Sequence, residues 1–221
     1  IHRRIVTGGG KALFFHNVKN SKFPVVTNVF GSDYRMKLAF GSEPEAFIKT
    51  LVELIQGPFP PKLSYLWQKR NQLKRLFSLG LKNSSYAHVT QCAIDPPDLE
   101  RLPLLKLWPD DGGHFITLPL VYTSWGNSNN LGMYRIQRYN KNTTGLHMQI
   151  GKGGGFHLAQ AEEAGVKMPV TIFIGGPPAL TLSAIAPLPE NVPELIFASL
   201  LQGKKLDTTH VAGHDHPLVS T

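Results

Sequence analysis

Residues 130–155 gather chemical groups that could bind an anion. The stretch ends in Gly151, Lys152 and three further glycines. Consecutive glycines let backbone N–H groups approach a ligand closely, and such turns commonly surround an anion. Arg135 and Lys152 would add two full positive charges near the same point. The pattern therefore predicts a hairpin that ends in an anion cradle.

Two other interpretations of this stretch stay open. A glycine-rich turn is most often a surface loop, and a basic hairpin is most often a solvated face. The spacing is neither the G-x-G-x-x-G of nucleotide folds nor the phosphate loop that ends in Lys-Ser/Thr. Spacing alone therefore does not identify a ligand.

Three histidines and an aspartate near the C-terminus also resemble a metal site. His210, His214, His216 and Asp215 lack a further ligand on a rigid element, which favours a polar loop. The sequence contains no Ser/His/Asp order, H-E-x-x-H or C-x-x-C, so a hydrolase or a zinc protease has no support. The single cysteine, Cys92, excludes an internal disulfide and is expected to be a small buried residue.

Composition indicates a globular chain with a basic surface. With 221 residues, of which 42% are hydrophobic, the chain can bury a core and form one large or two small domains. A net charge of +8 makes nucleic acid, an anionic membrane surface or an anionic ligand worth testing. The densest basic run, residues 69–75, lacks interleaved aromatics and is better explained as a solvated helix face. No apolar run approaches a membrane span.

The elements that would position these groups indicate an α+β chain. Hydrophobic spacing and turn residues predict helices at 42–57, 64–79, 156–164 and 193–201. They predict strands at 12–15, 25–30, 87–94, 115–122, 132–139, 146–150, 170–174 and 181–186. The first helix has a capping box, with Ser42 followed by Glu45. Pro96, Pro97 and Asp98 are expected to separate an N-terminal domain, 1–97, from a second domain, 98–221, whose short strands suggest a barrel or sandwich.

Several long strings resemble one enzyme family. LPLLKLWPDDGGHFITLPLVYTS, NLGMYRIQRYNKNTTGLHMQIGKGG and IFIGGPPALTLSAIAPLPENVPELIFASLLQG closely resemble the UbiD decarboxylases, which include the polyprenyl-4-hydroxybenzoate carboxy-lyases of ubiquinone synthesis. GGGKALFFHNVK and FPVVTNVFGS resemble that family's N-terminal domain. The resemblance implies an N-terminal α/β domain that lacks its start, then an incomplete flavin-binding split β-barrel. It also implies that the family's C-terminal oligomerisation domain is missing.

The resemblance implies a cytoplasmic lyase that uses prenylated FMN, with Mn²⁺ or another divalent metal and often K⁺ at the cofactor phosphate. The reaction implied is reversible, non-oxidative decarboxylation of an aromatic or α,β-unsaturated acid, such as a polyprenyl-4-hydroxybenzoate. Full-length members are homo-oligomers, and a polyprenylated substrate would imply peripheral membrane association. No nucleic-acid partner is implied.

Site residues follow from the matching motifs. Asn130 and Glu194 match the family's metal-binding positions, and both offer hard oxygen ligands. Arg135 matches the catalytic arginine that pairs with a substrate carboxylate or an acidic partner, a role that its planar fork suits. The positions that match cofactor contacts are Met133, Tyr134, Arg135, His147, Met148, Gln149, Lys152 and Gly153.

The sequence departs from the family pattern at two points. Many members carry a metal-binding histidine where this chain has Gly151, and His157, expected in a loop, is a candidate substitute. The family's catalytic acid lies in an E-G-P-[FY]-G-type segment, which these 221 residues do not contain. We therefore expect the chain alone to be inactive. A non-catalytic module that binds flavin phosphate and a basic nucleic-acid-binding protein are the alternatives.

Overall fold

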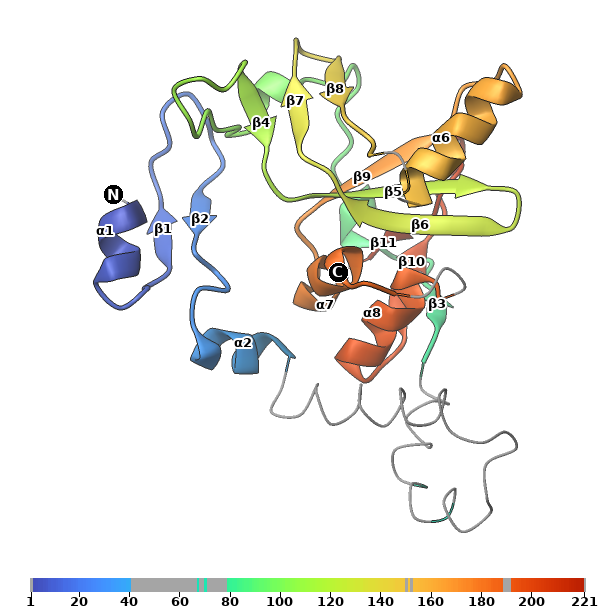
Figure 1. The fold of residues 1–221 in the computed structure, drawn as a ribbon, viewed down its shortest axis with the longest axis horizontal. Coiled ribbons are helices and arrows are strands. Elements are labelled where there is room, and N and C mark those ends of the chain that lie inside the picture. The colour runs from blue at the N-terminus through green and yellow to red at the C-terminus, as the bar shows by residue number, and fades with distance from the viewer. Residues whose placement is uncertain are drawn as a thin grey trace.

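The computed structural model describes residues 2–40, 67, 70, 79–149, 151, 153–188 and 192–220. The predicted helix 42–57 lies outside these residues, as does the predicted helix 64–79 apart from positions 67, 70 and 79. The fold is α+β, and its described strands form four small sheets with helices beside them (Figure 1). No closed barrel is found among the described strands.

The N-terminal segment forms a hairpin between two helices. Helix α1 (His2–Thr7) precedes strands β1 (Leu13–Phe15) and β2 (Val25–Thr27), and α2 (Asp33–Phe40) follows. The strands pair antiparallel, with Leu13 opposite Thr27, so the predicted strand pair is confirmed. The second strand ends earlier than predicted, because Asn28 takes a left-handed conformation (φ 59°).

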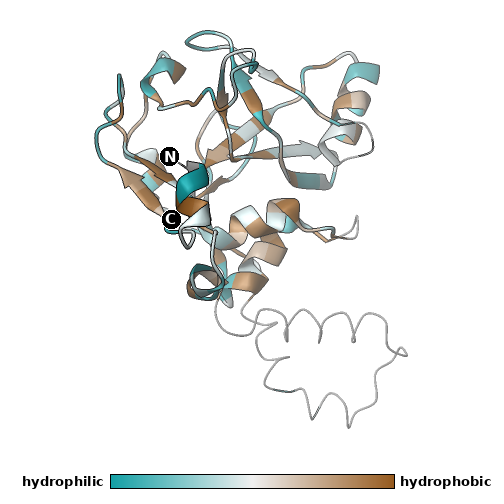
Figure 2. Ribbon diagram, turned by 60° about the vertical axis from the view of Figure 1, so that its left-hand side comes forward, coloured by the Kyte–Doolittle hydropathy of each residue, from teal (hydrophilic) through white to brown (hydrophobic). Residues whose placement is uncertain are grey.

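A three-stranded antiparallel sheet carries the main core. Strand β5 (Pro119–Trp125) lies between β6 (Ser128–Met133) and β9 (Val170–Ile174). Leu120, Tyr122 and Leu131 form a cluster with buried residues of α7 (Pro178–Ile185) and α8 (Glu194–Gln202). Helix α6 (Gly153–Glu163) contacts β5 and β6. Figure 2 shows hydrophobic colouring on strands and helices of this core.

Two smaller sheets flank this core. Strands β4 (His114–Ile116), β7 (Ile136–Arg138) and β8 (Thr144–Leu146) form one, with a second core cluster around Ile136. Strands β11 (Leu218–Val219), β10 (Leu206–Thr209) and β3 (Leu81–Asn83) form the other, in which β3 and β10 run parallel. Two 3₁₀ turns, η1 (His88–Thr90) and η2 (Leu99–Arg101), connect β3 to β4.

Most predicted strands of the second half exist but are shorter. The prediction for 170–174 is confirmed by β9. The predicted strand 115–122 divides into β4 and β5 before Pro119, and 132–139 divides between β6 and β7 at Tyr134 and Arg135. Strand β8 covers residues 144–146, so it begins and ends earlier than the predicted strand 146–150. The predicted helices 156–164 and 193–201 are confirmed by α6 and α8, and α8 ends at Gly203 (φ 68°).

Two strand predictions are wrong. Residues 181–186 belong mostly to α7, which begins at Pro178 and buries Leu180 and Ser183 on one side. Residues 87–94 contain η1, because the N–H and the hydroxyl of Thr90 both donate to the Ala87 carbonyl, at 3.1 and 2.8 Å. These local bonds compete with strand pairing. Cys92 is exposed, not buried as predicted.

Candidate functional site

The two residues predicted to bind metal lie on neighbouring elements, Asn130 in the edge strand β6 and Glu194 in helix α8. Glu194 is the first residue of α8, and its Oε2 accepts the backbone N–H of Leu131 at 3.1 Å. Leu131 directly follows Asn130, so the carboxylate lies beside the backbone that carries the Asn130 amide. Burial raises the pKa of the Glu194 carboxyl, although its own N–H and that of Leu131 act to lower it. Burial, and to a smaller extent the charge of Glu194, raises the pKa of Tyr122.

The Asn130 side chain is half-buried, and its amide is incompletely bonded. Its Nδ2 has no hydrogen-bond partner in the described structure. The rest of the amide lies against the first residue of α6, since a Cβ placed on Gly153 would collide with Asn130 Oδ1. Leaving a buried polar atom without a partner is costly. An amide can offer a donor to an anion or, turned about its last bond, an oxygen to a cation.

The predicted glycine cradle is the first turn of a helix, because α6 begins at Gly153. Its first residues lie close to β6 and to the segment after it. A Cβ on Gly154 would come within 3.1 Å of the Tyr134 hydroxyl, and a Cβ on Gly132 would collide with the Tyr134 ring. The N–H groups of a first helical turn have no partner within the helix and favour anions. The glycines therefore allow the helix N-terminus to approach Asn130.

His157 does not replace the missing metal ligand. It lies buried in α6, not in a loop as predicted, and both ring nitrogens are occupied. Nδ1 is 2.9 Å from the Thr123 hydroxyl and Nε2 is 3.3 Å from the Ser128 hydroxyl. Burial lowers the pKa of His157 and so favours the neutral ring. Gly151 is exposed, with φ 85°, and contributes no side chain.

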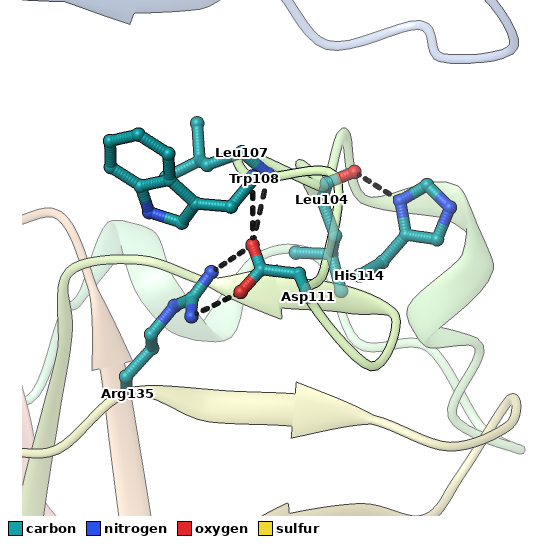
Figure 3. Close-up of polar contacts among 6 residues, drawn as sticks. All are labelled: Leu104, Leu107, Trp108, Asp111, His114 and Arg135. Carbon is teal, nitrogen blue, oxygen red and sulfur yellow. Dashed lines mark hydrogen bonds and ion pairs between the residues drawn. The ribbon is translucent and has the colours of Figure 1, made fainter.

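Arg135 forms a bidentate ion pair with Asp111 (Figure 3). Its Nη1 and Nη2 donate to the two carboxylate oxygens at 2.8 and 2.7 Å. The guanidinium carbon lies 3.7 Å from the centre of the Phe115 ring. Asp111 Oδ2 also accepts the N–H groups of Leu107 and Trp108, at 3.2 and 3.1 Å. The Arg135 pair and these N–H groups hold the pKa of Asp111 well below its usual range.

The other predicted cofactor contacts lie in different environments. Met133 packs against the main core cluster, whereas Tyr134 and Met148 pack against the second one. His147 and Gln149 are exposed. Lys152 lies outside the described residues. Contact of these residues with a cofactor stays a prediction.

The three C-terminal histidines differ in solvent exposure. His216 is buried and bonds the hydroxyls of Ser124 and Thr171 at 2.9 and 3.0 Å, whereas His210 and His214 are exposed. No group of three or more His, Cys, Asp or Glu residues that could hold a metal is found in the described part of the chain. Because Nε2 and Nδ1 of His216 are both hydrogen-bonded, this residue fixes the C-terminal segment to β5 and β9.

Sequence reasoning missed Asp111 as a site residue. Asp111 stands four residues after Leu107, and the intervening Pro109 favours a turn that a carboxylate can close through backbone N–H groups. That signal was present in WPDDGG, but it does not identify Arg135 as the partner. Thr123 and Ser128, which bond His157, come from a strand pairing that only the fold supplies.

Two domain descriptions match the chain. The 3-octaprenyl-4-hydroxybenzoate carboxy-lyase Rift-related domain, UbiD, matches residues 82–221, and the N-terminal domain of the same enzymes, UbiD_N, matches residues 1–55. The chain belongs to the UbiD family. The family resemblance and the α+β fold predicted from the sequence are therefore confirmed.

Relatives in sequence are longer than this UbiD chain. A Chlamydia pneumoniae protein described as one subunit of a 4-hydroxybenzoate decarboxylase is 51% identical over 221 residues, which are 99% of this chain and 38% of that protein. An uncharacterized protein of Aquifex aeolicus is 37% identical over 209 residues, which are 90% of this chain and 42% of that protein. The chain thus spans about two fifths of these relatives' length.

Solved structures show the same fold. The closed form of Sedimentibacter hydroxybenzoicus vanillic acid decarboxylase is 27% identical, with a TM-score of 0.78 over 98% of this chain and 45% of that one. The UbiD-class enzyme HmfF of Pelotomaculum thermopropionicum, in complex with prFMN, is 22% identical. It also has a TM-score of 0.78, over 99% of this chain and 48% of that one, and at this identity it shows the fold alone.

The described part of the chain contains no helix that is both long and apolar enough to cross a membrane.

Proposed function

We propose that this chain carries the cofactor-binding part of a UbiD-type carboxy-lyase. In this proposal, a divalent cation at Asn130 and Glu194 holds a flavin phosphate against the first turn of α6. One observation carries it: the half-buried carboxylate of Glu194, at the start of α8, bonds the edge strand β6 one residue after Asn130, whose buried amide nitrogen has no partner in the described structure. Membership of the family and the fold shared with an enzyme solved with prFMN support it.

The donor set fits a hard cation. A buried carboxylate is costly unless a positive charge pairs with it. Among the described residues no cationic side chain pairs with Glu194, and burial raises the pKa of its carboxyl. Carboxylate and amide oxygens suit Mn²⁺ or Mg²⁺. Since Gly151 offers no side chain and the His157 nitrogens are engaged, phosphate oxygens and water would complete the coordination, and K⁺ would be a further counter-ion at the phosphate.

The glycines and their neighbours would hold the cofactor. Prenylated FMN supplies the electron sink for cleavage of the bond to the carboxylate carbon when it is bound. Gly153 must lack a Cβ for the helix N-terminus to lie against Asn130. The remaining proposed contacts come from both sides of the hairpin and its loop: Met133, Tyr134, Arg135, His147, Met148, Gln149 and Lys152.

Arg135 would receive the substrate carboxylate in the full-length protein. The names of two relatives, a 4-hydroxybenzoate decarboxylase subunit and a vanillic acid decarboxylase, favour a hydroxylated aromatic acid. The description of the matching family domain favours a polyprenylated form as well. A planar guanidinium matches a carboxylate through two parallel hydrogen bonds. We extend the proposal to a cytoplasmic homo-oligomer that would associate peripherally with a membrane when its substrate is polyprenylated.

Flavin titration with and without Mn²⁺ tests this proposal. Wild-type chain should bind FMN about 5- to 150-fold more tightly with Mn²⁺, the usual range of coupling between two ligands of one protein. Glu194→Gln should abolish this dependence, because the amide carries no charge. Glu162→Gln, which changes an exposed glutamate of α6, is the matched control and should keep it. Equal FMN affinity in wild type with and without the metal would contradict the proposal.

Gly151 favours one alternative, a non-catalytic module that binds flavin phosphate, because it removes the ligand that many family members supply at this position. Incubating the chain with prenylated FMN, Mn²⁺ and 4-hydroxybenzoate tests the expectation that these 221 residues alone do not turn over. Turnover in a full-length homologue that carries glycine at this position would exclude the alternative.

A further inference from the structure

The Arg135 side chain is restrained at its fork and on one face. Asp111 accepts from both terminal nitrogens, and the guanidinium carbon stacks 3.7 Å from the centre of the Phe115 ring. The Asp111 side chain is 9% exposed, whereas that of Arg135 is 37% exposed. The nearly buried Asp111 therefore holds the more accessible Arg135.

Asp111 is itself held by the turn that contains it. Its Oδ2 accepts the N–H groups of Leu107 and Trp108, and its own N–H donates to the Trp108 carbonyl at 3.1 Å. Oδ2 thus closes the turn and, together with Oδ1, clamps the arginine. In Figure 3 the turn and the Arg135 fork face each other across this carboxylate. The direction of the fork is set by the turn, not by Arg135 alone.

One edge of the guanidinium remains open. A guanidinium has five N–H donors. The pair with Asp111 uses one donor of each terminal nitrogen, and no described residue accepts from Nε. The Nε edge can therefore bind a second carboxylate through two parallel hydrogen bonds. Such a ligand would meet an arginine whose charge is already largely balanced.

We infer that Asp111 is a positioning residue, which fixes the direction of the Nε edge of Arg135 and weakens its attraction for a carboxylate. The inference rests on the proposed function, in which that ligand is the substrate carboxylate. It deepens that function, since it makes the site select ligands by orientation more than by charge. Weak ground-state binding suits a decarboxylation, because holding the carboxylate more tightly before the reaction than in the transition state would slow its loss.

Side-chain NMR of Arg135 in the 221-residue chain tests the clamp. A bidentate partner slows rotation about the Cζ–Nη bonds, so wild type should show separate Nη proton resonances. In Asp111→Asn these resonances should merge, while the amide oxygen still accepts the N–H groups of Leu107 and Trp108 and keeps the turn closed. Asp110→Asn, at the exposed neighbouring position, should keep them separate. Arg135→Lys assigns the signals.

A benzoate titration followed at the Nε resonance tests the effect on affinity. Asp111→Asn should bind benzoate about threefold more tightly than wild type, which corresponds to removing one unit charge about 7 Å away in a water-like medium. Unchanged Nη resonances or unchanged benzoate affinity in Asp111→Asn would overturn the inference.

Phe115→Leu provides a second test in which Asp111 is intact. It should keep separate Nη resonances while the ring-current shift of Nε disappears, and merged resonances would overturn the inference. Failure of the proposed function would appear instead as FMN binding that does not depend on Mn²⁺, so the two failures are distinguishable.

Discussion

Two carboxylates of this chain are partly withdrawn from water, with opposite results. Asp111 meets the fork of Arg135 and two backbone N–H groups, and its pKa falls. Glu194 meets the Leu131 N–H, has no cationic partner among the described residues, and its pKa rises. The first arrangement is complete, whereas the second lacks a positive charge. The difference shows where the chain needs a ligand from outside.

The neighbours of each carboxylate support this comparison. The Arg135 fork has both terminal nitrogens bonded, whereas the Asn130 amide beside Glu194 leaves a buried nitrogen without a partner. Buried polar groups in native proteins are nearly always satisfied. The Asn130 edge is therefore the better candidate for a cation and a phosphate, and the Arg135 turn is the better candidate for an oriented contact.

The largest expected effect comes from adding a side chain at Gly153, next to the Asn130 amide. In Gly153→Ala the new Cβ would collide with the Asn130 amide, so the free energy of unfolding should fall by about 1–3 kcal/mol, the range for overpacking. Gly154→Ala is the matched control, since its nearest atoms are the mobile ends of Tyr134 and Met148, at 3.1 and 3.5 Å. Urea unfolding measures both. Equal losses would show that the Asn130 contact is not special.

A smaller effect is expected from removing the unpaired charge of Glu194. Glu194→Gln removes that charge and keeps an acceptor for the Leu131 N–H. Without metal at pH 7 it should therefore raise Tm by about 2–4 °C, which corresponds to about 1 kcal/mol for a chain of this length. A raised folded pKa means that the stability contributed by Glu194 is present at low pH and lost as pH rises through that pKa. The gain in Tm should therefore vanish near pH 4, and added Mn²⁺ should reverse the ranking at pH 7.

The smallest effect is local and distinguishes the two carboxylates directly. Carboxyl carbon NMR between pH 2.5 and 7 should show Glu194 titrating above its ordinary value of 4.5, and Asp111 still ionised well below 3.8. The lowered pKa means that the contribution of Asp111 is present above the ordinary aspartate pKa and is lost only as pH falls through the folded value. Titration of both groups at ordinary values would remove the contrast between the regions.

Local sequence signals predicted the elements that depend on local chemistry. Strand β9 follows an uninterrupted β-branched and aromatic run, and α8 ends at Gly203, where a left-handed residue is needed. The error at 181–186 has a clear cause. Alternating small and apolar residues fit a strand, but Pro177 and Pro178 begin a helix whose Ser183 hydroxyl bonds the Ala179 carbonyl at 2.7 Å.

The site residues were predicted by resemblance to a family, and their roles stay predictions. Asn130 and Glu194 were identified by resemblance, and the structure brings the Glu194 carboxylate to the residue that follows Asn130. Periodicity could not supply that contact, because it joins β6 to the start of α8. The clamp on Arg135 and the hydroxyls around His157 likewise depend on long-range contacts. The domain boundary near Pro96 stays a prediction, although β3, before it, pairs with β10, far beyond it.

The parallel pairing of Leu81 with Leu206 also has a consequence for synthesis. Strand β3 leaves the ribosome long before β10, so its backbone donors and acceptors cannot form this ladder until the more than one hundred intervening residues have been made. Closing so long a segment has an entropic cost, so we expect this sheet to form late in folding. During translation the newly made β3 would depend on water, or on a chaperone, to keep its open edges from pairing with other chains.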